Sequence, residues 1–163
     1  MYYGSYFSHA MRTLLKGAVL GMVLLALLAV AYQALGMSAL YVFRPDGSLD
    51  LLSGIIGFPV NVILTFLDNF TNGVLWIVVQ YGALTGLAVG LLVLLFGRFL
   101  KQRPTGVLCG VIAALAAIAF LALSGQLTSG IDRYMLAARW LPALLYAATA
   151  GWLGWTLRRG TVA

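Results

Sequence analysis

Four long stretches of this chain contain no aspartate, glutamate, lysine, arginine or histidine. They lie between Lys16 and Arg44, between Asp68 and Arg98, between Arg103 and Asp132, and between Arg139 and Arg158. A charged side chain at the centre of a bilayer costs at least about 2.5–3.5 kcal/mol, so segments that cross lipid exclude such residues. The pattern therefore predicts an integral membrane protein.

Composition supports the same class and limits the number of domains. Of the 163 residues, 63% are apolar and 9% are charged, and the mean hydropathy is +1.01. Soluble domains contain about 25% charged residues, and a membrane helix needs about 20 apolar residues to cross about 30 Å of hydrocarbon. Four such helices with their connections fill residues 1–163, so we expect a single transmembrane helical domain.

The fold class that we expect is an all-α integral membrane protein with four transmembrane helices. They are predicted at about residues 14–35, 73–97, 105–123 and 140–157. Gly36 and residues 44–47 (Arg-Pro-Asp-Gly) predict a turn after the first helix, because proline fixes φ and glycine allows positive φ. The short basic link at residues 98–104 predicts that the second and third helices are antiparallel neighbours.

Residues 50–70 form an additional amphipathic helix in this interpretation. Its polar or small residues recur at steps of three and four, which is a helical period. They are Asp50, Ser53, Gly54, Gly57, Asn61, Thr65, Asp68 and Asn72. A helix that lies on a membrane surface usually has a broad face rich in lysine and arginine, and this one has none. We therefore expect an interfacial or re-entrant helix tucked against the bundle, with a fifth crossing as the alternative.

Charge counting favours four crossings over five. With four crossings and a cytoplasmic N-terminus, seven of the ten basic residues lie inside, and all four aspartates lie outside. Five crossings give at best six basic residues to four and place Arg12 and Lys16 on the outer side. The positive-inside rule thus predicts cytoplasmic N- and C-termini, and the compact, Ala- and Leu-rich sequence suggests a bacterial inner membrane.

Glycines at four-residue spacing are the strongest packing signal in the chain. Such residues form a smooth strip along a helix, and in lipid this strip lets a second helix approach closely. The predicted helix-packing or partner-contact residues are Gly82, Gly86, Gly90, Gly106 and Gly110, and Gly17 with Gly21 is a shorter case. Packing within one subunit is the favoured interpretation, and packing between subunits is the alternative.

A few polar residues are further candidates for contact. The Gln80 amide lies within the second predicted helix, and amides in lipid seek hydrogen-bonding partners. Arg133, Arg139 and Trp140 near the fourth helix are predicted to contact a lipid headgroup or a partner loop. Local ion pairing and membrane anchoring are the simpler explanation for these three residues.

The sequence lacks the residue patterns of most catalytic and binding classes. It shows no paired carboxylates for acid–base chemistry, no cluster for a metal or cofactor, and no phosphate-binding loop. The basic residues are dispersed among helix ends, which argues against nucleic acid. We therefore expect no enzymatic activity and no cofactor.

These patterns favour a small non-catalytic multi-pass subunit or accessory scaffold of a larger membrane complex. Its expected partners are membrane lipid and either other integral membrane subunits or copies of itself. The alternative is a homo-oligomeric pore or membrane-perturbing effector, with Asn61, Thr65 and Asp68 at its mouth. A lipid-headgroup-acting enzyme is the third hypothesis, and it rests on residues 132–139.

Overall fold

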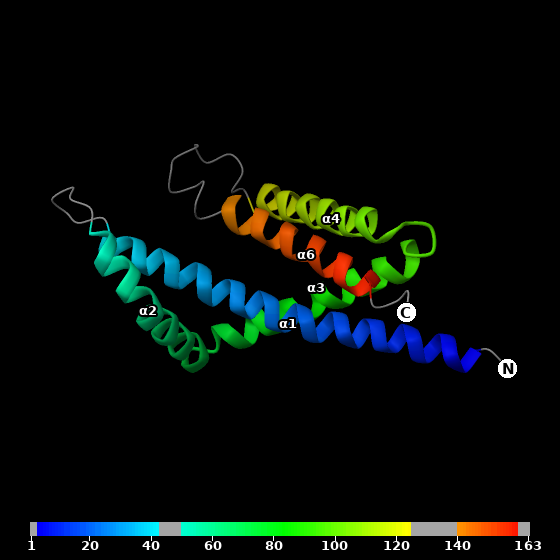
Figure 1. Ribbon diagram of the computed structural model, residues 1–163, viewed down its shortest axis with the longest axis horizontal. Coiled ribbons are helices and arrows are strands. Elements are labelled where there is room, and N and C mark those ends of the chain that lie inside the picture. The colour runs from blue at the N-terminus through cyan, green and yellow to red at the C-terminus, as the bar shows by residue number, and fades with distance from the viewer. Residues whose placement is uncertain (1–2, 43–49, 125–139, 160–163) are drawn as a thin grey trace.

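The computed structural model describes residues 3–42, 50–124 and 140–159, which form an all-helical protein (Figure 1). The described residues contain no strand. The helices are α1 (Tyr3–Val42), α2 (Leu51–Thr71), α3 (Val74–Phe96), α4 (Gln102–Leu123) and α6 (Leu141–Arg159). The predicted all-α membrane fold is confirmed.

Helix α1 is much longer than the predicted first span. Its 40 residues measure about 60 Å at 1.5 Å per residue, about twice the hydrocarbon thickness of a bilayer. No turn begins at Gly36, which lies inside the helix, and residues 44–47, which carry the rest of that predicted turn, lie outside the described residues. One glycine costs a helix only about 1 kcal/mol relative to alanine, and the surrounding alanine and leucine residues favour continuation.

Helix α2 begins and ends with defined local contacts. The Asp50 carboxylate caps its first turn, accepting hydrogen bonds from the Ser53 backbone N–H at 3.1 Å and from the Ser53 hydroxyl at 2.8 Å. At the other end Gly73 has a φ of 73°. Glycine adopts this left-handed conformation without strain, so Asn72 and Gly73 separate α2 from α3.

The middle of the polar stripe of α2 faces the protein, whereas Ser53, Asp68 and Asn72 of that stripe are exposed along with the apolar residues. Asn61, Thr65 and Asn69 are each about 95% buried, and α2 packs mainly against α1. The exposed apolar residues include Leu52, Ile55, Ile56, Ile63, Leu64 and Phe70. This is the reverse of a soluble amphipathic helix, and it agrees with the expected helix tucked against the bundle.

The remaining helices form two antiparallel pairs. We call α1 with α3 the first pair and α4 with α6 the second pair, because these are the most extensive helix contacts in the described structure. A buried cluster joins them where the pairs meet: Val89, Val93, Cys109, Ala113, Ala150, Leu153 and Leu157. In Figure 1 the two pairs are close where α6 ends and diverge toward the end where α6 begins.

The expected pairing of the second and third predicted helices is not what the structure shows. Helices α3 and α4 are joined by the short turn after Phe96, yet they touch each other only slightly. Each instead packs extensively on a helix that is distant in sequence. The length of a link limits where a helix can go, but the match between small-residue surfaces selects its neighbour.

Four of the described helices are long and apolar enough to cross a membrane, namely α1, α2, α3 and α4. Helix α6 is not among them, although it lies beside α4 in the second pair. Its glycine, tryptophan and threonine residues lower its hydropathy relative to α4. The chain is thus a multi-pass helical membrane protein by the length and composition of its helices.

Candidate functional site

The first pair is held together by direct backbone contact at glycines. Gly17 on α1 faces Gly86 on α3, and one turn further along Gly21 faces Gly82. A Cβ atom added at Gly82 would lie 2.8 Å from the Cα of Met22. Van der Waals contact at this range replaces the hydrophobic effect as the force that joins helices in lipid.

The predicted glycine strip of α3 is therefore covered by α1 within the same chain. Gly82, Gly86 and Gly90 are all buried. A Cβ added at Gly90 would lie 3.3 Å from the Leu14 side chain of α1. The strip forms an internal packing surface.

The second pair uses the same device with looser contacts. A Cβ added at Gly106 would lie 3.0 Å from the Gly151 carbonyl oxygen, and one at Gly110 would lie 3.3 Å from the Ala147 carbonyl oxygen. At Gly154 an added Cβ would lie 2.7 Å from the Cys109 sulfur. The structure thus places both predicted glycines of α4 against α6.

The two pairs share one antiparallel register. Four contacts define it: Gly17–Gly86 and Gly21–Gly82 in the first pair, and Gly106–Gly151 and Gly110–Ala147 in the second. In each pair a four-residue step forward on one helix meets a four-residue step backward on the other. The described structure is therefore built from two helix pairs with similar glycine contacts.

A polar contact ties α2 to the far half of α1. The Asn69 side-chain amide donates a hydrogen bond to the Gln33 side-chain oxygen at 2.6 Å. The predicted polar stripe of residues 50–72 did not include Asn69. The missed signal was the spacing, because Asn69 follows Thr65 by four residues and Asn61 by eight, on one helix face.

Gln80 differs from the predicted glycines because it points outward. Its side chain is exposed on α3, about 9 Å along the helix from Val74 at 1.5 Å per residue. Its neighbours on that face are also exposed, with Trp76 at 67% and Leu84 at 62% of full exposure. No residue in the described part of the chain hydrogen-bonds the Gln80 amide.

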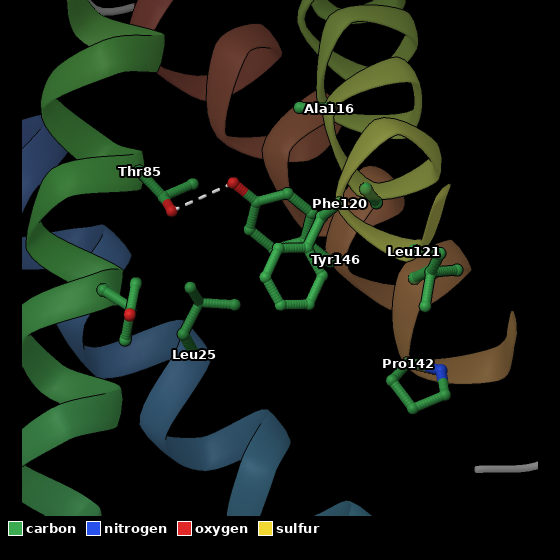
Figure 2. A pocket seen from close by; sticks show the side chains of 10 residues that line it. Leu25, Thr85, Ala116, Phe120, Leu121, Pro142 and Tyr146 are labelled. Atoms are coloured by element: carbon green, nitrogen blue, oxygen red, sulfur yellow. Dashed lines mark hydrogen bonds between the residues drawn. The ribbon is translucent and has the colours of Figure 1, made fainter. Parts of the chain in front are cut away.

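An apolar cleft lies between the two pairs where they diverge (Figure 2). Its main cavity has a volume of about 620 Å³, and an adjoining cavity of about 280 Å³ shares Leu25, Tyr81, Pro142 and Tyr146 with it. Within it the hydroxyls of Thr85 and Tyr146 are 3.1 Å apart and hydrogen-bonded. Neither this cleft nor the bond between α3 and α6 was predicted from sequence.

The predicted headgroup-contact residues are only partly described. Trp140 is half-buried just before α6 begins, whereas Arg133 and Arg139 lie outside the described residues. The enzyme hypothesis rests on residues 132–139 and also lies outside them. Within the described ranges no three His, Cys, Asp or Glu side chains come together as a group that could hold a metal ion.

Most of the residues that the pore hypothesis uses are packed within this chain. Asn61 and Thr65 are buried, and the α3 glycines contact α1. Asp68 is exposed and accepts a hydrogen bond from the Asn72 side chain at 2.8 Å. This arrangement leaves the outward apolar faces of α1, α2, α3 and α4 as surfaces available for association.

Comparison of the chain with protein-family models, with curated proteins and with solved structures finds no match.

Proposed function

We propose that the protein is a non-catalytic, multi-pass membrane subunit that acts as an accessory scaffold of a larger complex. It associates through the outward face of α3, where Gln80 lies between Trp76 and Leu84. The observation that carries this proposal is the exposed Gln80 amide on an otherwise apolar helix face.

The physical argument concerns the hydrogen bonds of this amide. An amide moved from water into an apolar medium without a partner costs about 2–7 kcal/mol. A hydrogen bond to a neighbouring helix removes most of that penalty, although such bonds contribute only about 0.6 kcal/mol on average to helix association. The α3 face thus gains stability when a helix that carries a donor or acceptor covers it.

The membrane orientation belongs to the same proposal. The beginning of α1 and the end of α6 lie at the same end of the molecule (Figure 1). Arg12 and Lys16 lie there on α1, and Arg158 and Arg159 lie in the last turn of α6. Clustered basic residues favour the cytoplasmic side, so we place this end in the cytoplasm of a bacterium and the chain in its inner membrane.

The test is the mass of the intact assembly extracted from native membranes in a gentle detergent, with its co-purifying chains identified. The wild type is expected to bring down at least one different membrane protein. The replacement Gln80→Leu removes the amide and introduces an apolar side chain of similar size. It is expected to release that protein. Leu115→Gln on the exposed face of α4 is the matched control and keeps the complex intact.

Two outcomes would contradict the proposal. A wild-type preparation that contains this chain alone, as a monomer, would exclude a scaffold role. A homo-oligomer would indicate that a second copy satisfies the amide, which is both donor and acceptor. That result would favour the homo-oligomeric alternative instead.

A further inference from the structure

The cleft between the two helix pairs has the position and the lining of a lipid site. One wall belongs to the first pair, through Leu25 on α1 with Tyr81 and Thr85 on α3. The other wall belongs to the second pair, through Phe120 on α4 and Tyr146 on α6. Figure 2 shows Leu25 and Thr85 on one side of an open space and Phe120 and Tyr146 on the other. Its volume lies within the range of about 300–1,000 Å³ that is usual for small-molecule sites.

The lining of the cleft is apolar in both of its cavities. The hydroxyls of Thr85 and Tyr146 are hydrogen-bonded to each other, so neither hydroxyl requires a polar group from a ligand. The adjoining cavity reaches Tyr32 and Gln33, which lie about 12 Å further along α1 than Leu25 at 1.5 Å per residue. No charged residue lines either cavity. The cleft is thus apolar along its whole length, including the part beside Tyr32 and Gln33.

The surrounding medium decides what fills such a space. The cleft lies between helices that are apolar enough to cross a membrane. Protein interiors leave few voids larger than a water molecule, and water enters a cavity only where several polar groups hold it. Hydrocarbon can fill an apolar cavity without polar partners. Within a membrane, the hydrocarbon available is the acyl chains of the lipids.

We propose that the cleft binds an acyl chain of a membrane phospholipid from the leaflet on the α2 side. The chain lies between Leu25, Phe120 and Tyr146 and extends along α1 toward Tyr32. The bound lipid fills the space between the two pairs and sets how far they diverge. This inference does not depend on the proposed scaffold function.

The experiment uses the full-length protein in vesicles of phosphatidylethanolamine and phosphatidylglycerol. The vesicles contain a phospholipid probe with a photoreactive diazirine in the middle of one acyl chain. After illumination, peptide mass spectrometry locates the label. We expect label on Tyr146 in excess of that on Val111 and Leu115, which face outward on α4.

Filling the cleft provides the decisive comparison. Ala117→Phe places a ring in the space between the pairs, because Ala117 lines the cleft. Label on Tyr146 should fall about tenfold, which corresponds to a loss of about 1.4 kcal/mol in binding. Ala119→Phe makes the same substitution at an exposed position of α4 that does not line the cleft, and it should leave the labelling unchanged.

Equal label on cleft and outward residues would overturn the proposal, because it would describe annular lipid alone. Label on Tyr146 that persists in Ala117→Phe would also overturn it. Absence of lipid label on Tyr146 in the wild type would also overturn it, because the cleft would then exclude acyl chains. If Ala117→Phe does not fold, the smaller replacement Ala143→Val also fills part of the cleft. It should lower the number of phospholipids that the purified protein retains.

Discussion

At the residue scale, the first helix pair depends on the missing side chains of Gly17 and Gly86. The backbones of α1 and α3 touch at this point, so any Cβ would overlap a carbonyl group on the facing helix. The atoms that each added Cβ would meet first belong to the facing backbone, which cannot move aside as a flexible side chain can. The close approach is therefore specific to glycine at these two positions.

We expect Gly86→Ala to lower the free energy of unfolding by about 1–3 kcal/mol, the usual cost of overpacking. The two backbones must separate to admit the methyl group, and contacts along the whole pair weaken. Unfolding in mixed detergent micelles, followed by circular dichroism, measures the change.

Gly36→Ala is the matched control for that substitution. Gly36 lies in α1, and a Cβ added there meets nothing within 4 Å. Alanine is favoured over glycine in a helix by about 1 kcal/mol, so this variant should be as stable as the wild type or more so. Equal losses in both variants would refute close packing at Gly86.

The Gln33–Asn69 hydrogen bond offers a second residue-scale prediction. Replacing both by leucine, singly and together, forms a double-mutant cycle that isolates their interaction. We expect a coupling free energy of about 0.6 kcal/mol, the average for interhelical hydrogen bonds in membranes. The same unfolding assay applies, and a coupling of zero would show that the bond adds no stability between α1 and α2.

At the element scale, α2 is unusual because polar residues along its middle are inside and its apolar residues are outside. Asn61, Thr65 and Asn69 face the protein, whereas Ile63 and Phe70 are exposed at 61% and 68%. In water this arrangement would expose a large apolar patch, which soluble proteins avoid. In lipid it costs nothing, because the exposed side chains are as apolar as the medium.

Cysteine labelling tests this environment for α2. The only native cysteine, Cys109, is buried, so a cysteine introduced elsewhere reports on its own position. Ile63→Cys should resist a membrane-impermeant maleimide in intact vesicles, because its side chain contacts hydrocarbon. Asn72→Cys, in the exposed turn between α2 and α3, should react. Rapid labelling of Ile63→Cys would mean that α2 lies in water.

The sequence predicted the helices of this protein better than their partners. The absence of charges located the helices, and the expected break near residue 73 coincides with the positive φ of Gly73. Helix pairing was not predictable in the same way, because Gly82 and Gly86 show only that some helix comes close. The cleft depends on the angle between two pairs, which involves contacts between residues as distant as Gly17 and Leu157.

At the scale of the whole molecule, the two pairs place the beginning of α1 and the end of α6 together. Ser8 is exposed near the start of α1 and Arg159 is exposed at the end of α6. Ser8→Cys and Arg159→Cys should therefore react with an impermeant maleimide from the same side of the membrane, and Asn72→Cys should react from the opposite side. Inverted and right-side-out vesicles distinguish the two sides. Labelling of Ser8→Cys and Arg159→Cys from different sides would contradict this topology.

The shared register of the two pairs has a consequence for how the protein is made. Gly86 follows Gly17 by about 70 residues, whereas Gly151 follows Gly106 by about 45. At about 5–20 residues per second, the ribosome needs several seconds to supply the partner of α1. During that interval the glycines of α1 are open to any helix that diffuses past in the membrane. Biogenesis, more than the finished fold, is thus the stage at which α1 can join the wrong neighbour.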